Sequence, residues 1–328
     1  MFRYFRKNLD IAFILLVWLV WMVAMAWLHQ WHLFVENWFM SVTMAFGSFV
    51  AGSTSQGGGA VAFPVMTLGF GIEPKGARDF SMMIQSVGMT SAAVAIFWRR
   101  IQVERTALVV AGIAGAAGVI VGLETVQWWF ASDPTKVFFV AMWMAFGFAL
   151  WRINHLKRPV RRMELRDRSP GTILILVAAG FLGGIITGLL GSGLDILVFA
   201  MLVLGFRVCE LVATPTSVVL MAANSLVGFA WRASGGGGDP ISPEIWNYWW
   251  VCVPIVAVGA PMGARFISGR GHEFVIRLLL FVIAAQFIGA LLIVPFTKSL
   301  VLLAVSTFGL GVAAFLAVWQ WGRCHSQD

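Results

Sequence analysis

The chain has 328 residues, of which 59% are hydrophobic and only 12% are charged. It also contains 16 Trp and 27 Phe, so its composition lies far from that of a soluble globular domain. Apolar runs of about 20 residues, long enough to cross a hydrocarbon layer of ~30 Å, recur along the chain. These features exclude a soluble core and predict an all-α polytopic membrane protein.

The net charge of +8 indicates membrane orientation rather than a nucleic-acid partner. If the N-terminus lies in the cytoplasm, only Lys75, Arg78, Lys136, Arg232 and Lys298 remain for the other side or the membrane. The other 18 of the 23 Lys and Arg residues then fall on the cytoplasmic side. This positive-inside bias predicts that both termini are cytoplasmic.

The expected elements form five segments in chain order. Residues 1–37 hold an N-terminal transmembrane helix over 9–29, whose apolar run is too long for a signal peptide and lacks a small-residue cleavage site. The remaining segments are a first repeat over 38–152, a basic cytoplasmic linker over 153–171, a second repeat over 172–298, and a C-terminal transmembrane helix with its tail over 299–328. Each repeat is expected to begin with a broken apolar unit, over 38–71 and 172–206, and to continue with three plain spans.

Two glycine-rich breaks are the strongest signal for function. They read GSTSQGGGAVAFP over 52–64 and GIITGLLGSGLDIL over 184–197. A shift of about 134 to 136 residues superimposes these breaks and also places ARDFS (77–81) on ATPTS (213–217). If each broken unit returns to its starting side, the two halves have opposite orientation, as in the inverted repeats of secondary transporters.

A related shift aligns a helix-packing motif of the two halves. When the second half is shifted back by about 141 residues, its GxxxG pair Gly259 and Gly263 aligns with Gly118 and Gly122 of the first half. The drift between the two shifts is small enough for different loop lengths in the repeats.

The return limbs of the broken units, 60–71 and 194–206, are too short for a comfortable crossing, about 18 to 20 Å as helix. Their N-terminal ends are therefore expected at membrane mid-depth, where free amide groups suit an anion. Irregular backbone at that depth must be buried in protein or line a polar cavity. Two tilted full spans per unit are the alternative, since the first limbs are long enough to cross.

The candidate substrate-binding residues surround these breaks. They are Ser55, Gln56, Gly57, Gly58, Gly59, Gly191, Ser192, Gly193, Thr216 and Ser217, with Thr187, Thr214 and Asn224 as further hydroxyl and amide candidates. Two structural alternatives stay open. The glycines can serve close helix packing, and the polar side chains can satisfy backbone groups that the breaks free.

Three charged residues in apolar surroundings have competing interpretations. Asp195 is a candidate for carrying a coupling proton, but an acid at a helix start also serves as an ordinary cap. Arg78 is either an interfacial ion-pair partner of Asp79 or a group that attracts the anion. Arg232 is expected to snorkel at a helix end. The loop 234–244 is expected to be flexible, without a binding role.

On the two glycine motifs and the ATPTSVVLMAANSL segment (213–226), the chain resembles the TauE/SafE sulfite exporter family, a group of sulfur-compound permeases. The resemblance extends over nearly the whole chain from Phe46 to Trp321. It implies export or uptake of small sulfur oxyanions or organosulfonates, for which coupling to protons is often proposed. The chain departs from the family pattern in two places. The first half has ARDFS where a Thr-Ser pair is expected, and the second break has no proline that aligns with Pro64.

Together these features predict an exporter of sulfite or an organosulfonate such as sulfoacetate, working by alternating access in a bacterial inner membrane. Protons and membrane lipid are the other expected partners. A proton-driven importer of thiosulfate or another small anion, an anion channel and an intramembrane enzyme are the alternatives. The enzyme hypothesis lacks a nucleophile with a base, a metal cluster or a P-loop, so no catalytic residue, metal or cofactor is expected.

Overall fold

The computed structural model describes residues 9–54, 57–129, 131–156, 162–165, 168–268 and 272–324. Nine helices in these ranges are long and apolar enough to cross a membrane. The described part contains an isolated backbone bridge, between Arg162 and Val208, but no strand. The expected all-α polytopic fold is therefore confirmed.

The first half of the chain contains a broken helical unit and three long helices. Its elements are α2 (Leu9–Trp27), α3 (Leu33–Glu36), α4 (Trp38–Ser53), α5 (Gly57–Pro64), the π-helical turn η1 (Val65–Gly69), α6 (Pro74–Trp98), α7 (Arg105–Glu124), the 3-10 turn η2 (Val126–Trp128) and α8 (Ser132–Leu156).

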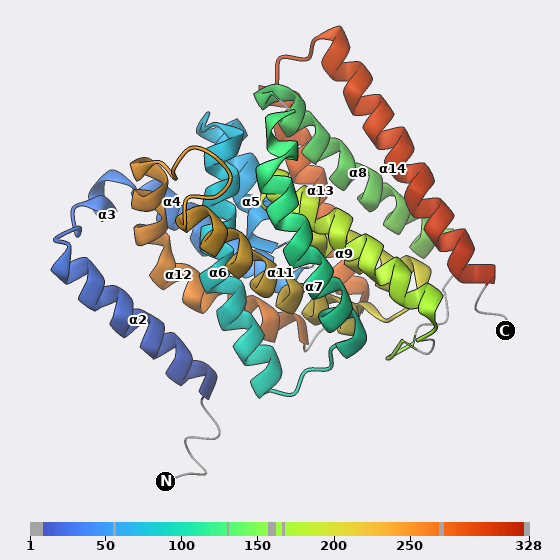
Figure 1. Ribbon diagram of the computed structural model, residues 1–328, viewed down its shortest axis with the longest axis horizontal. Helices are drawn as coiled ribbons and strands as arrows, with labels where there is room; N and C mark the ends of the chain where they lie inside the picture. Colours follow the sequence, from blue (N-terminus) through green and yellow to red (C-terminus); the bar gives the residue numbers. More distant parts are fainter. Residues whose placement is uncertain are drawn as a thin grey trace.

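The second half repeats this order from its broken unit onward. Its elements are α9 (Pro170–Leu190), α10 (Leu194–Ala200), the π-helical turn η3 (Met201–Gly205), α11 (Glu210–Ala233), α12 (Pro243–Ser268), α13 (His272–Ile293) and α14 (Lys298–Cys324). In both halves a short helix runs into a π-helical turn that ends at a glycine, Gly69 and Gly205. α2 and α14 lie at opposite ends of the molecule (Figure 1).

Each broken unit is a hairpin, a pair of helical limbs that pack on each other, α4 with α5 and α9 with α10. In the first unit, the rings of Phe39 at the start of α4 and Phe70 after η1 lie 4.6 Å apart. In the second, Val208 after η3 pairs with Arg162 of the linker that leads into α9. α4 has 16 residues, or about 24 Å of helix, so the first hairpin is shorter than a ~30 Å hydrocarbon core.

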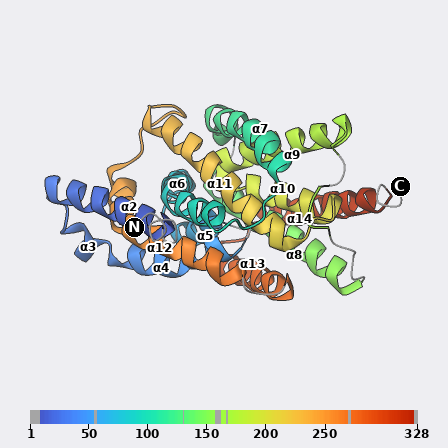
Figure 2. The ribbon, with the colours of Figure 1, turned by 90° about the horizontal axis from the view of Figure 1, so that it is seen from below.

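The central helices pack in an order that reads alike from both ends. α9 lies on α7, α7 on α11, α11 on α6, α6 on α12, and α12 on α4. Figure 2 shows α7 and α9 on one side of α6 and α11, with α4 and α12 on the other. This order matches α4 with α9, α6 with α11 and α7 with α12. The boundaries of the repeats and their inversion stay predictions.

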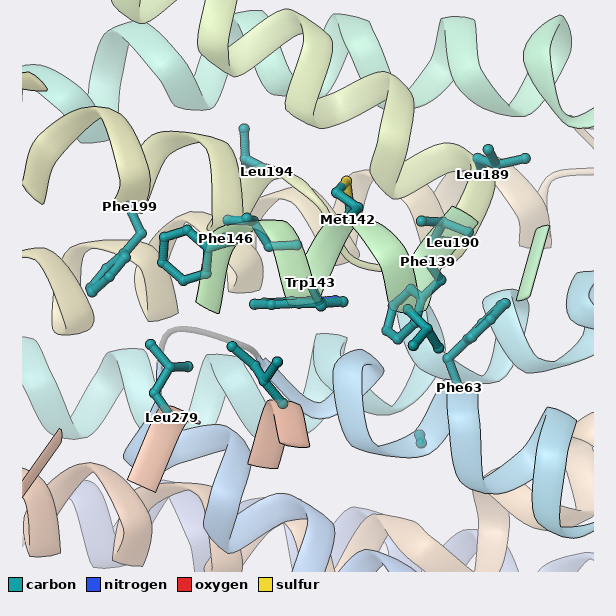
Figure 3. Packing of buried hydrophobic residues seen from close by; sticks show 14 of the residues in the cluster. Phe63, Phe139, Met142, Trp143, Phe146, Leu189, Leu190, Leu194, Phe199 and Leu279 are labelled. Carbon is teal, nitrogen blue, oxygen red and sulfur yellow. The ribbon is translucent and has the colours of Figure 1, made fainter. Parts of the chain in front are cut away.

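A row of aromatic rings on α8 connects the short limbs of the two hairpins (Figure 3). Phe139 lies 4.9 Å from Phe63 of α5, and Phe146 lies 5.9 Å from Phe199 of α10, measured between ring centres. Trp143 stands between Phe139 and Phe146. Because offset and edge-to-face ring pairs stabilise a packed core, α8 fixes both limbs relative to one another.

The GxxxG motifs hold each hairpin against the opposite half of the chain. A Cβ added at Gly118 of α7 would overlap the carbonyl oxygen of Phe181 in α9, and one at Gly263 of α12 would overlap that of Phe49 in α4. Small residues allow such close approach of helices in membranes.

We expect Gly118→Ala to lower the apparent unfolding temperature of the purified protein, because its Cβ would overlap the backbone of α9 and overpacking of this kind costs about 1–3 kcal/mol. Gly112→Ala is the matched control on the same helix, since its Cβ would meet the Leu220 side chain at an ordinary 3.4 Å. Equal unfolding temperatures for the two variants would contradict the close packing of α7 on α9.

Candidate functional site

The second break forms where α9 ends at a left-handed glycine. Gly191 has φ of +77°, a conformation that glycine adopts readily, and its N–H donates to the carbonyl oxygen of Thr187 at 2.7 Å. The residues after Gly191 form a compact group joined by hydrogen bonds. The Ser192 hydroxyl donates to the Asp195 carboxylate at 2.9 Å, and the Gly193 N–H donates to the same carboxylate at 2.7 Å.

Side chains of the protein itself occupy the amides at the start of α10. Asp195 accepts from Gly193 N, and the Thr187 hydroxyl accepts from Leu194 N at 3.0 Å. The expectation that free amides face the anion is therefore wrong for these two groups, because a buried N–H must find a partner. Asp195 is completely buried and caps the start of α10. This is the structural role that the sequence offered as the alternative to proton carriage.

The N-terminal half of α6 packs directly on this break. Gln85 donates its amide to the carbonyl oxygen of Gly191 at 2.8 Å and to that of Ser81 at 2.9 Å. A Cβ added at Gly191 would contact the Ser81 side chain. The structure thus brings Gly191, Ser192, Gly193 and Asp195 together with α6.

Two buried amide side chains, Gln85 and Asn224, lie at the contact between α6 and α11. Met82 of α6 packs on Gly228 of α11, and Met89 shares a cluster with Met221 further along, so the helices run antiparallel. Gln85 and Asn224 occupy the stretch between these two contacts. Their residue exposures are 1% and 2%.

Neither of these amides is fully satisfied by the described residues. Gln85 Oε1, Asn224 Oδ1 and Asn224 Nδ2 have no hydrogen-bond partner among them. A buried unsatisfied polar atom costs about 1–3 kcal/mol, and such atoms are uncommon in folded proteins. Asn224 therefore marks a place that suits a polar ligand, at the contact between α11 and the helix α6 that packs on the second break.

The first break is described only on its two sides. Ser53 and Thr54 return their hydroxyls to the α4 backbone, at 2.7 Å and 3.0 Å. Gly57, Gly58 and Gly59 form the first turn of α5. Ser55 and Gln56 lie outside the described residues. A meeting of the two breaks at mid-depth stays a prediction.

Thr216 lies away from the second break. Its hydroxyl donates to Val212 O at 2.6 Å and accepts from Glu104 N at 2.9 Å, in the loop that follows the far end of α6. Ser217 donates to the carbonyl oxygen of Thr214 at 2.9 Å. Both hydroxyls therefore have backbone partners.

Arg78 belongs to a buried charge cluster that joins α6 and α11. Asp79 binds Arg78 at 2.7 Å through one carboxylate oxygen and Arg232 at 2.8 Å through the other. Arg232 also donates to the carbonyl oxygens of Gly236 and Asp239. The snorkelling expected of Arg232 is wrong, because Asp79 and these carbonyls satisfy its guanidinium inside the protein. The loop expected to be flexible supplies these partners.

Two cavities occupy corresponding places at opposite ends of α6. The larger has a volume of about 260 Å³ and is lined by Arg78, Gln127, Thr135 and Leu189 among others; we call it the Arg78 cavity. The smaller, about 20 Å³, is lined by Thr214, Glu210 and Gly52 among others. Arg78 and Thr214 hold the same position in the aligned ARDFS and ATPTS motifs.

Two hairpins with polar breaks, buried in a bundle of apolar helices, define a multi-pass membrane protein with the features of a transporter. The family model for the sulfite exporter TauE/SafE matches residues 39–285, so the chain belongs to this family of membrane transporters for sulfur compounds. No curated protein and no solved structure matches the chain.

Sequence reasoning missed several residues that organise the site. Gln85 carried no motif, and only its polarity within an apolar span signalled a role. Glu104 binds Leu165 N of the linker at 2.9 Å. Gln127 binds Arg78 and the carbonyl oxygen of Gly237. Asp10, buried beneath Arg99 and Arg265, ties α2 to the ends of α6 and α12.

Proposed function

We propose that the protein exports a small sulfur-containing anion, sulfite or an organosulfonate such as sulfoacetate, across the inner membrane by alternating access. The observation that carries this proposal is the buried amide of Asn224, whose nitrogen and oxygen both have no hydrogen-bond partner among the described residues of an apolar bundle. An oxyanion accepts hydrogen bonds from amide and hydroxyl groups without a formal charge partner. An inside-negative potential favours anion exit by about 2.3 kcal/mol per charge per 100 mV.

In this proposal the anion binds between the second break and the contact of α6 with α11. Ser192, Gly193 and Asn224 donate to it, and the first break, with Ser55, Gln56 and the glycines 57–59, contributes from the opposite face. The 18-to-5 distribution of cations supports cytoplasmic termini and two hairpins that enter from opposite sides.

Asp195 gives this site a means of proton coupling. Its carboxylate holds Ser192 and Gly193 N, which are the donors that an anion needs. A protonated Asp195 releases them, so the binding of the anion and the binding of a proton favour each other. Proton and anion then travel together, and a proton gradient directed inward drives uptake. This linkage favours proton-driven import of thiosulfate or another small anion as the second candidate.

Flux of radiolabelled sulfite, sulfoacetate, taurine and thiosulfate in proteoliposomes tests the function, with the pH gradient and the voltage set independently. We expect sulfite or sulfoacetate to move faster than in empty vesicles. Asn224→Leu should lower this flux about ten-fold without lowering the unfolding temperature, because it replaces an unsatisfied amide by an apolar side chain. Failure of every sulfur anion to cross would reject the function.

Asp195→Asn tests the coupling. The amide is of equal size and can still accept from Gly193 N, but it binds no proton. We expect flux driven by a pH gradient to disappear in this variant while flux driven by voltage persists. Asp133→Asn, at a carboxylate that is 45% exposed on α8, is the control. Unchanged proton-dependent flux in Asp195→Asn would remove Asp195 as the carrier.

A further inference from the structure

The Arg78 cavity contains positive charge that the site at the second break does not require. Arg78 lies in its wall, and Lys75, Gln127, Ser132 and Thr135 add polar groups. Its volume of about 260 Å³ corresponds to roughly nine water molecules at about 30 Å³ each. The cavity therefore has room for a small oxyanion and part of its hydration shell.

The buried charged side chains next to the Arg78 cavity have a net positive charge. Arg78 and Arg232 share the single carboxylate of Asp79, and all three side chains are at most 5% exposed. Glu73 also lines the cavity and Glu124 lies at the end of α7, but both are exposed, so solvent screens their negative charge. The buried cluster therefore carries one excess positive charge, which is costly unless an anion compensates it.

Neutral groups hold the two arginines in place without removing this charge. Arg232 donates to the carbonyl oxygens of Gly236 at 2.6 Å and Asp239 at 2.7 Å. Arg78 donates to the side-chain oxygen of Gln127. Carbonyl dipoles orient a guanidinium, but only an anion neutralises it.

We infer that the Arg78 cavity is a second anion site, which takes a small oxyanion of the sulfate or sulfite type, with Arg78 and Lys75 supplying the positive charge. Lys75 Nζ lies 4.2 Å from the ring centre of Trp128, a cation–π contact that keeps the ammonium at the wall. Leu189 lies in the same wall two residues before Gly191, so the site adjoins the second break. Its place in the transport cycle rests on the proposed function, whereas anion binding itself does not.

Binding of radiolabelled inorganic sulfate to the full-length protein in lipid nanodiscs tests this site. Arg78→Gln removes the excess charge and leaves Asp79 paired with Arg232. Lys75→Gln removes the exposed ammonium that packs on Trp128. We expect each variant to weaken sulfate binding about ten-fold or more, and Arg78→Lys to weaken it less because the charge remains.

Lys136→Gln is the matched control. Lys136 pairs with Asp133 at 3.1 Å and directly follows Thr135 of the cavity wall, but it does not line the cavity. This variant should bind sulfate as the wild type does.

Equal affinity in the wild type, Arg78→Gln and Lys75→Gln would overturn the inference, and so would the absence of saturable sulfate binding to the wild type. If Arg78→Gln unfolds, Lys75→Gln alone decides. If no sulfur anion crosses proteoliposomes but sulfate binding still depends on Lys75 and Arg78, the proposed function fails and this site stands.

Discussion

Every buried backbone group in a membrane must find a partner within the protein, and the structure around the second break follows from this requirement. Where α9 stops, three side chains replace the missing helical bonds. Asp195 accepts from Gly193 N, Thr187 accepts from Leu194 N, and Gln85 donates to the carbonyl oxygen of Gly191. Gln85 comes from α6, so the hairpin is tied to the helix that also carries Arg78.

The same requirement explains why polar residues gather along α6 and α11. These two helices occupy the middle of the packing order, with a hairpin, a GxxxG helix and a cavity on each side. The cavities differ in volume, about 260 Å³ beside Arg78 and about 20 Å³ beside Thr214. Near the smaller cavity, Glu104 joins the linker to the loop before α7 through Leu165 N.

The sequence was sufficient for the features that depend on composition and local chemistry. Hydropathy predicted the spans, and glycine clusters predicted both breaks, since a break in an apolar run needs residues that tolerate unusual backbone. Asp195 was recognised as a cap or a proton carrier from its position two residues after Gly193. The cap is seen in the structure, and proton carriage stays a prediction.

What escaped sequence reasoning depends on how helices are rotated and on contacts between distant residues. Gln85 reaches Gly191 only because one particular face of α6 meets the second break, and an apolar span does not encode that face. Arg232 was misjudged because its partner Asp79 lies 153 positions away and already had a neighbour in Arg78. Thr216 belongs to the ATPTS motif that supported the resemblance, yet its hydroxyl accepts from Glu104 N, 112 positions away.

The entry of the two hairpins from opposite faces can be measured with single cysteines in a cysteine-free variant. Glu73→Cys lies next to the end of the first hairpin, and Met163→Cys lies in the linker segment beside the end of the second. Both positions are exposed. With a membrane-impermeant maleimide added to intact cells, Cys at 73 should react and Cys at 163 should react only after the membrane is opened. Reaction of both from the same face would contradict the opposed arrangement.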